Sequence, residues 1–381
     1  MPAKQDLEKT LENGNENPNA FKLWIDRRVL TRIGKEISNV YPEFDRKRLI
    51  AIAPKLDSLE LKPRVLLIRD ELRALLPPDF LQALKILLAS TKAGKLSGFT
   101  LWPYTEFIQT FGLAHREPAL AALATLTELF TAEFAVRPFL QKETTQTLNF
   151  LKKCARSSNP HQRRWASEGS RPRLPWGIKL DIFIKEPSRT LEILELLKND
   201  DERYVRKSVA NHLNDISKDH SALVVKTLKR WNKNADESHR EKISWITRHA
   251  LRTLIKRGDV GALSAIGASA NAKVKVSNLN LGTYKFETGD RIQIQFQLRS
   301  LAKKNQRVVV DYVIHFMKSN GKTTPKVFKL KAFDLAAGGR LEITKAHHLK
   351  KITTRRYYTG AHALEIQVNG TVHARAEWLL I

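Results

Sequence analysis

The segment QRRWASE, residues 162–168, has counterparts in VRKSVAN at 205–211 and in ITRHALR at 246–252. The copies begin 43 and 41 residues apart. TLEILELLKNDD and ALVVKTLKRWNKN lie between them, and their apolar residues recur every three or four positions, as in amphipathic helices. A chance alignment of amphipathic helices is the alternative, because the residue-by-residue match is weak. The regular spacing favours repeated helix pairs that bury their apolar faces by stacking on their neighbours.

Helical periodicity extends over residues 21–260, for example in LQALKILLAS and PALAALATLTELFTAEF. We therefore predict a mainly α fold over this range, an α-solenoid of HEAT-like repeats. The small residues of GALSAIGASANA, 261–272, are expected to form a linker. Residues 1–20 are polar and are expected to be disordered. They lack the apolar core of a signal peptide, which indicates a cytoplasmic protein.

The pattern changes to period two over residues 273–381, which is typical of strands. The strand-like runs are KVKVSNL, RIQIQFQLRS, RVVVDYVIHFMK, KVFKLKAF, RLEITKA, ALEIQV and VHARAEWLLI. Seven short alternating strands predict an immunoglobulin-like β-sandwich, and Asn369-Gly370 predicts a type I′ hairpin between the last two. From residue 271 onward there are 20 Lys and Arg against 7 Asp and Glu. A purely structural appendage does not need this charge. A basic surface binds phosphates by releasing their counterions, so we expect the sandwich to contact the phosphate backbone of DNA.

Basic residues dominate the composition, with 66 Lys and Arg against 39 Asp and Glu and a formal net charge of +27. Such a surface gains affinity for nucleic acid by releasing counterions from phosphates, so double-stranded DNA is the first candidate partner. A membrane is disfavoured because there is no apolar run of about 18 residues, and plain solubility is the third explanation. The single cysteine, Cys154, indicates a reducing compartment. No metal-ligand cluster or phosphate-binding glycine loop is recognisable, so we expect neither a metal nor a cofactor.

Basic positions recur in the repeated segments and would line the concave face of a solenoid. These positions are Arg163, Arg164, Arg206, Lys207 and Arg248. For any one of them the alternative is a structural ion pair with a neighbouring acidic residue. As a set they favour phosphate binding.

The segment RRWASEGSRPRLPWG, residues 163–177, departs from what a repeat protein needs, because its helix runs into Gly169 and two prolines. Glu168 is followed closely by Arg171, Arg173 and Trp176. Nearby arginines favour the ionised carboxylate, which suits Glu168 to stabilise positive charge rather than to act as an acid. The alternative is a helix end with Glu168 in a salt bridge and both tryptophans in the core.

Two further acids are candidates for the same concave face. Asp215 lies one turn beyond Asn211, which aligns with Glu168, and Glu133 lies in the earlier segment EFAVRPFL. An ordinary carboxylate on a helix surface is the alternative for each.

Three segments resemble the hallmark segments of the DNA alkylation repair family typified by AlkD: TAEFAVRPFL, RRWASEGSRPRLPWG and VRKSVANHLNDISKDH. The appended sandwich makes the chain similar to the AlkC branch of that family. The resemblance implies a bacterial, nucleoid-associated DNA glycosylase of base excision repair, which acts as a monomer on duplex DNA containing alkylated bases. It implies excision of 3-methyladenine and 3-methylcytosine without base flipping, with site positions at Glu133, Glu168, Trp176 and Asp215.

The expected chemistry follows from the charge of the lesion. A base alkylated at a ring nitrogen is cationic and leaves without protonation, so positive charge develops on the sugar. Glu168, supported by Asp215, would stabilise this oxocarbenium-like state and orient the attacking water. Trp176 would favour the cation through its ring face, and Trp165 is a second candidate for that role. The expected DNA contacts are Arg163, Arg164, Trp165, Arg171, Arg173, Arg206, Lys207, Asn211 and Arg248.

The main alternative function is a non-catalytic helical-repeat scaffold that binds DNA, and a protein of the membrane surface is a third. Loss of base release on replacing Glu168, with DNA affinity kept, would distinguish catalysis from the scaffold.

Overall fold

The computed structural model describes residues 21–350 and 356–381. The expected disorder of residues 1–20 lies outside the described residues. The chain divides into two compact units, the first ending at His212 and the second beginning at Leu213. The second unit therefore contains both the last helices and the sandwich, whereas the sequence pattern suggested a boundary at the end of the helical region.

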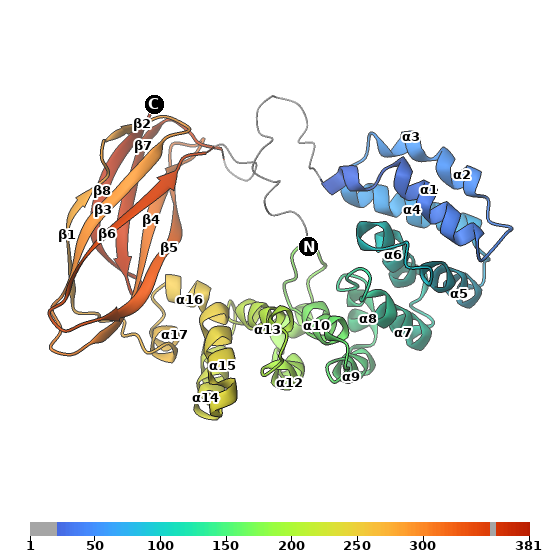
Figure 1. The fold of residues 1–381 in the computed structure, drawn as a ribbon, viewed down its shortest axis with the longest axis horizontal. Coiled ribbons are helices and arrows are strands. Elements are labelled where there is room, and N and C mark those ends of the chain that lie inside the picture. The colour runs from blue at the N-terminus through green and yellow to red at the C-terminus, as the bar shows by residue number, and fades with distance from the viewer. Residues whose placement is uncertain (1–20, 351–355) are drawn as a thin grey trace. The chain divides into compact units, whose positions relative to one another are not determined.

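The first unit is helical, and its elements follow one another along the chain (Figure 1). They are η2 (Phe21–Trp24), α1 (Arg27–Ser38), α2 (Arg46–Ala51), α3 (Ala53–Leu56), α4 (Leu61–Leu75), α5 (Phe80–Thr91), η3 (Gly98–Leu101), α6 (Trp102–Phe111), α7 (Arg116–Leu126), α8 (Arg137–Lys142), α9 (Thr144–Cys154), α10 (Pro160–Gly169), α11 (Asp181–Lys185), α12 (Ser188–Leu197) and α13 (Arg203–Ile216), which crosses the unit boundary. Polar residues cap several of these helices: Asp26 accepts hydrogen bonds at the start of α1, and Asn159 does so before Pro160 in α10.

The predicted repeat is confirmed by two equivalent arginines. In α10, Arg163 Nη1 donates to the carbonyl oxygens of Ser157 and Ser158, at 3.0 and 2.8 Å. In α13, Arg206 Nη1 donates to the carbonyl oxygens of residues 200 and 201, at 2.5 and 2.8 Å. Each guanidinium thus holds the loop before its own helix, five and six residues upstream. Both arginines stabilise the turn within a helix pair, which explains why they recur with the repeat.

The second unit adds helices and strands to the end of α13. The helices are α14 (Ser221–Lys233), α15 (Glu237–Ala250), α16 (Arg252–Lys256) and α17 (Val260–Ala265). The strands are β1 (Val274–Asn280), β2 (Lys285–Phe286), β3 (Arg291–Ser300), β4 (Gln306–Met317), β5 (Thr323–Leu335), β6 (Arg340–His348), β7 (Gly360–Val368) and β8 (Thr371–Leu380).

The strands form a sandwich of two sheets, with orders β1-β3-β6 and β2-β8-β7-β4-β5. Alternate residues of β3, β4 and β7 point into one apolar core, as the period-two pattern predicts. All seven predicted strands are present, while β2 was missed because two residues carry no alternation. The hairpin is confirmed, since Val368 pairs with Thr371 and both intervening residues, Asn369 and Gly370, have positive φ.

The expected linker at 261–272 is wrong over its first half. Residues Val260–Ala265 form α17, which Asp259 caps by accepting a hydrogen bond from Ala262 N at 2.8 Å. Small residues allow this helix to pack closely, and Ala262 and Leu263 are fully buried. The following residues are also tied down, because Asn369 Nδ2 donates to Ser269 O at 2.7 Å. The small residues of this segment therefore allow close packing and do not form a flexible linker.

Candidate active site

Glu168 stands at the end of α10, where the helix stops at Gly169. A Cβ on Gly169 would lie only 2.6 Å from Val136 Cγ1, so this close approach requires glycine. Pro172 and Pro175 follow, and proline prevents the helix from continuing. The chain therefore turns directly behind Glu168.

Glu168 is buried, with 6% of its surface exposed. Its Oε1 accepts a hydrogen bond from Arg171 Nη1 at 2.5 Å and lies 3.7 Å from Arg164 Nη2. Its Oε2 accepts from Ser208 Oγ at 2.5 Å. Burial raises the pKa of Glu168, but the two arginines and these hydrogen bonds outweigh it and hold the pKa below 4.5. Glu168 thus lies among arginines at a helix end, an arrangement expected both of the predicted site and of its salt-bridge alternative.

Glu133 joins the same network through Arg164. Arg164 Nη1 pairs with Glu133 Oε2 and donates to Thr131 Oγ1 at 2.7 Å, and Thr131 Oγ1 in turn donates to Glu133 Oε2 at 2.7 Å. Glu133 is 8% exposed, so both acids are largely removed from solvent. The structure thus brings together two of the predicted acids, Glu133 and Glu168, around one shared guanidinium.

Arg137 organises the turn behind Glu168, a role that the sequence reasoning missed. Its side chain is fully buried. Its Nη1 donates to the carbonyl oxygens of Gly169 and Arg171 at 2.9 and 2.8 Å, and its Nε donates to Ile178 O at 2.6 Å. The only sequence signal is an arginine inside the apolar segment FAVRPFL, which is unusual because arginine is almost never fully buried unless it is paired.

The two acids form part of the wall of a pocket of about 390 Å³ in the first unit. Its aromatic wall consists of Phe99, Trp102, Phe130, Phe134 and Trp176. Trp176 is 72% exposed and has a φ of 66°, a strained value for a residue other than glycine. Aromatic faces beside carboxylates favour a cationic occupant.

The sequence indicated only Trp176 among these aromatic residues. The others lie in GFTLWPY and ELFTAEF, where they are spaced like core residues of amphipathic helices, so periodicity alone does not distinguish them.

Helix α13 closes the site from the side of Ser208. Ser208 Oγ contacts Ser167 Oγ at 3.0 Å in addition to Glu168. His212 is fully buried, and burial lowers its pKa to about 3, so its ring is neutral. Its Nδ1 lies 2.9 Å from Ser167 O, which fixes the proton on Nδ1 because a carbonyl only accepts. This residue therefore anchors α13 to the end of α10.

Several expected DNA contacts have internal roles. The expectation for Trp165 is wrong, because the side chain is fully buried and packs edge-on against Phe150. Its place in α10 turns it toward the core rather than the pocket. Arg164 and Arg171 pair with the buried acids, which need opposite charges inside the protein. Arg163 forms an ion pair with Asp200 at 2.7 Å, as the structural alternative anticipated.

The remaining expected DNA contacts differ in exposure. Lys207 in the first unit and Arg248 in the second are exposed, while Arg173, Arg206 and Asn211 are half-buried. Asp215 belongs to the second unit, where it is 3% exposed and accepts from Lys218 Nζ at 3.1 Å. Its participation in the site stays a prediction.

A basic hollow at the start of the chain was not identified from the sequence. It is lined by Arg27, Arg28, Thr31, Arg32, Lys35, Glu36 and Lys95, mostly from one face of α1. The signal was present as RRVLTRIGK, in which basic residues recur at helical spacing. Among residues 21–350 and 356–381 no group of acids, histidines or cysteines could hold a metal, and no helix has the length and apolarity to cross a bilayer.

Comparisons with known proteins agree with this architecture. Residues 130–254 match the DNA alkylation repair enzyme family, and residues 275–381 match the C-terminal Ig-like domain of the uncharacterised protein YhaZ. The uncharacterized protein YhaZ of Bacillus subtilis (strain 168) is 35% identical over 347 residues, covering 90% of this chain and 94% of that protein.

A solved structure is similar over almost the whole chain. It is the alkylpurine DNA glycosylase AlkC of Pseudomonas fluorescens, bound to DNA containing an abasic site analog. The TM-score is 0.89 and the identity 39%, with 95% of this chain and 99% of that chain covered.

Proposed function

This chain belongs to the family of DNA alkylation repair enzymes and is a DNA glycosylase, and we propose that it hydrolyses the N-glycosidic bond of bases that alkylation has made cationic. The proposed lesions are 3-methyladenine and 3-methylcytosine in duplex DNA, removed as the first step of base excision repair. The similarity to an alkylpurine DNA glycosylase bound to DNA supports the alkylated purine of the two, 3-methyladenine.

The observation that carries the proposal is the pair of buried carboxylates, Glu133 and Glu168, in the wall of an aromatic pocket. The pKa of Glu168 lies below its ordinary value, so it cannot act as a general acid near neutral pH. An already cationic base needs no acid. We propose that Glu168 stabilises the positive charge that develops on the sugar.

Glu133 is suited to orient the attacking water. Its Oε2 is engaged by Thr131 and Arg164, whereas no hydrogen bond to Oε1 is formed within the part of the chain that the structure describes. By contrast, both oxygens of Glu168 have partners. We therefore propose Glu133 for the role of orienting the water, which was expected of Glu168 and Asp215 from the sequence.

Trp176 is proposed to hold the cationic base through its ring face, a contact worth about 0.5–2 kcal/mol. Exposed cations such as Lys207 and those of the α1 hollow are proposed to bind phosphates as the monomeric enzyme grips duplex DNA. The strongly exposed position of Trp176 suits contact with a lesion that remains in the base stack, without flipping.

The test is release of free 3-methyladenine from methylated DNA by Glu168→Gln and Glu133→Gln, with DNA affinity measured in parallel. We expect each variant to keep its affinity and to lose about 100-fold or more in single-turnover rate. Glu186→Gln is the matched control, since Glu186 is an exposed acid paired with Arg189 and should keep the full rate. Unchanged base release in both site variants would overturn the assignment of the two carboxylates.

A further inference from the structure

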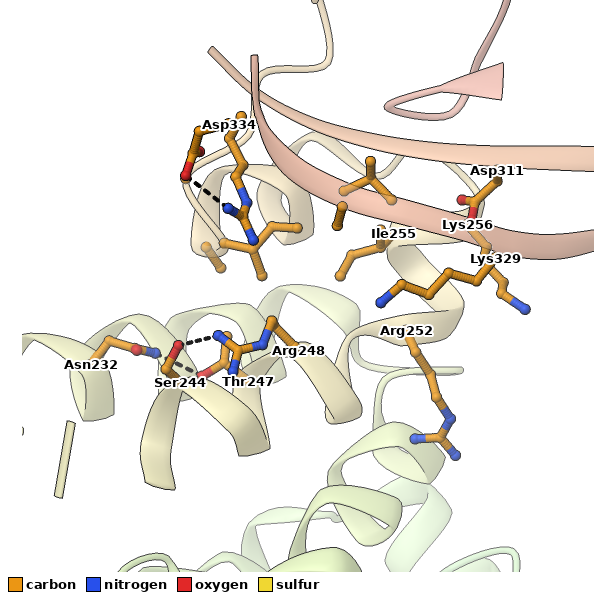
Figure 2. A pocket seen from close by; sticks show the side chains of 16 residues that line it. Asn232, Ser244, Thr247, Arg248, Arg252, Ile255, Lys256, Asp311, Lys329 and Asp334 are labelled. Carbon is orange, nitrogen blue, oxygen red and sulfur yellow. Dashed lines mark hydrogen bonds and ion pairs between the residues drawn. The ribbon is translucent and has the colours of Figure 1, made fainter. Parts of the chain in front are cut away.

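A second pocket, of about 430 Å³, lies within the second unit (Figure 2). Helices α14, α15 and α16 supply one side, including Asn232, Arg248 and Lys256. Strands β4 and β5 supply the other, including Asp311 and Lys329. The volume falls within the range of pockets that hold small organic ligands. None of these residues belongs to the carboxylate pocket of the first unit.

The strand side of the pocket follows from the alternation of β4. Val308 and Val310 point into the sandwich core, so the odd-numbered residues face outward. The pairing with β5 shifts at Asp311, which leaves Leu330 as an extra residue in β5. Burial raises the pKa of Asp311, whereas the backbone N–H of Leu330 lowers it. A bulge of this kind re-aims side chains and is common beside binding sites.

Positive charge is in excess around the pocket. Five basic side chains line it, namely Arg248, Arg252, Lys256, Arg307 and Lys329, against the two acids Asp311 and Asp334. Asp334 is already paired with Arg307 at 2.9 Å. Figure 2 shows Lys256 and Lys329 close to Asp311, and Lys329 is exposed. An anion would lower the mutual repulsion of these cations.

One buried acceptor in the wall of the pocket, on Asp311, has no hydrogen-bond donor among the described residues. Asp311 is 2% exposed, and its Oδ1 has no hydrogen-bond partner in the described part of the chain. Leaving a buried acceptor unsatisfied is costly, so a ligand N–H or O–H group would be favoured here. The apolar part of the wall, Ile255, Ile266 and Val309, suits a flat ring.

We propose that this pocket binds a nucleotide, with the phosphate beside Lys256 and Lys329, the heterocycle on the apolar wall, and a donor group of the ligand at Asp311. Either a free mononucleotide or the 5′-phosphorylated end of a DNA strand has this chemistry. The site is separate from the glycosylase pocket, so its occupancy does not depend on Glu168.

The test is titration calorimetry of the full chain with adenosine 5′-monophosphate, with adenosine and inorganic phosphate as partial ligands. We expect the nucleotide to bind at least about tenfold more tightly than either part, because both halves of the pocket are then filled. Lys329→Gln should weaken it about fivefold through the loss of one cation. The matched control is Lys331→Gln, which makes the same charge change on β5 outside the pocket.

A second variant fills the apolar side without changing charge. Ala332→Phe should abolish binding of the nucleotide, while circular dichroism verifies that the sandwich is folded. Glu168→Gln should bind the nucleotide as the wild type does. Competition by a 5′-phosphorylated oligonucleotide, but not by its unphosphorylated form, would assign the ligand to a strand end, and its failure would assign it to a free nucleotide. No binding of the nucleotide, or equal affinity in wild type, Lys329→Gln and Ala332→Phe, would overturn the proposal.

Discussion

The pocket in the first unit and the pocket in the second unit differ in the balance of acidic and basic side chains. In the first, Glu133 and Glu168 form ion pairs with Arg164 and Arg171. In the second, five basic side chains face two acids, one of which is already paired. The wall of the first pocket thus has two acids against one arginine and suits a cation, whereas the wall of the second has more basic than acidic side chains and suits an anion.

The two tryptophans of RRWASEGSRPRLPWG should respond most differently to substitution, because one lies in the core and the other in the pocket wall. Trp165→Ala should lower the free energy of unfolding by about 4 kcal/mol, because it empties a fully buried site. Trp176→Ala should change it by less than about 0.5 kcal/mol, since the ring is mostly exposed. The second variant should instead slow base release about tenfold through the lost ring contact. Urea unfolding and single-turnover assays measure both; equal stability loss would contradict the assignment.

Removing one basic side chain beside each pocket should lower the stability of the protein by different amounts. Arg164→Met leaves two buried carboxylates without their shared partner and should destabilise the protein by about 3 kcal/mol. Lys329→Gln removes an exposed charge and should cost less than about 0.5 kcal/mol. The measurement is urea unfolding of both variants in one buffer. Similar losses in the two would show that the first network is not held by Arg164.

The acids of the two pockets should also differ in the sign of their pH dependence. Burial raises the pKa of Asp311 from 3.8 to about 6, so the stabilisation of its protonated form is lost as pH rises through 6. For Glu168, whose pKa is lowered, stabilisation is present above 4.5 and lost as pH falls.

The free energy of unfolding of Asp311→Asn, relative to that of the wild type, should therefore rise by about 1–3 kcal/mol as the pH is raised from 4 to 7. Urea unfolding at the two pH values tests this. A constant difference between variant and wild type would refute the raised pKa.

The sequence predicted whatever depends on local periodicity. The helix-pair repeat could be predicted from its spacing, and the equivalent loop contacts of Arg163 and Arg206 agree with it. The strands could be predicted because the residues that face the core alternate with those that do not. Glu168 was found because a helix ran into Gly169 and prolines. The pocket of the second unit and the aromatic wall of the first pocket were not predicted, because their residues come from separate segments that meet only in the folded chain. Trp165 was misplaced because helix direction, not composition, decides which tryptophan is buried.

The pH dependence of base release tests the central claim most directly. The claim is that ionised carboxylates assist the departure of a base that is already cationic, with no general acid. Single-turnover release of 3-methyladenine, corrected for spontaneous loss, should then be independent of pH from about 6 to 8.5. It should fall only in acid, where Glu168 becomes protonated. A rate that declines steadily as pH rises through the neutral range would contradict the account, because it would require a protonated catalytic group.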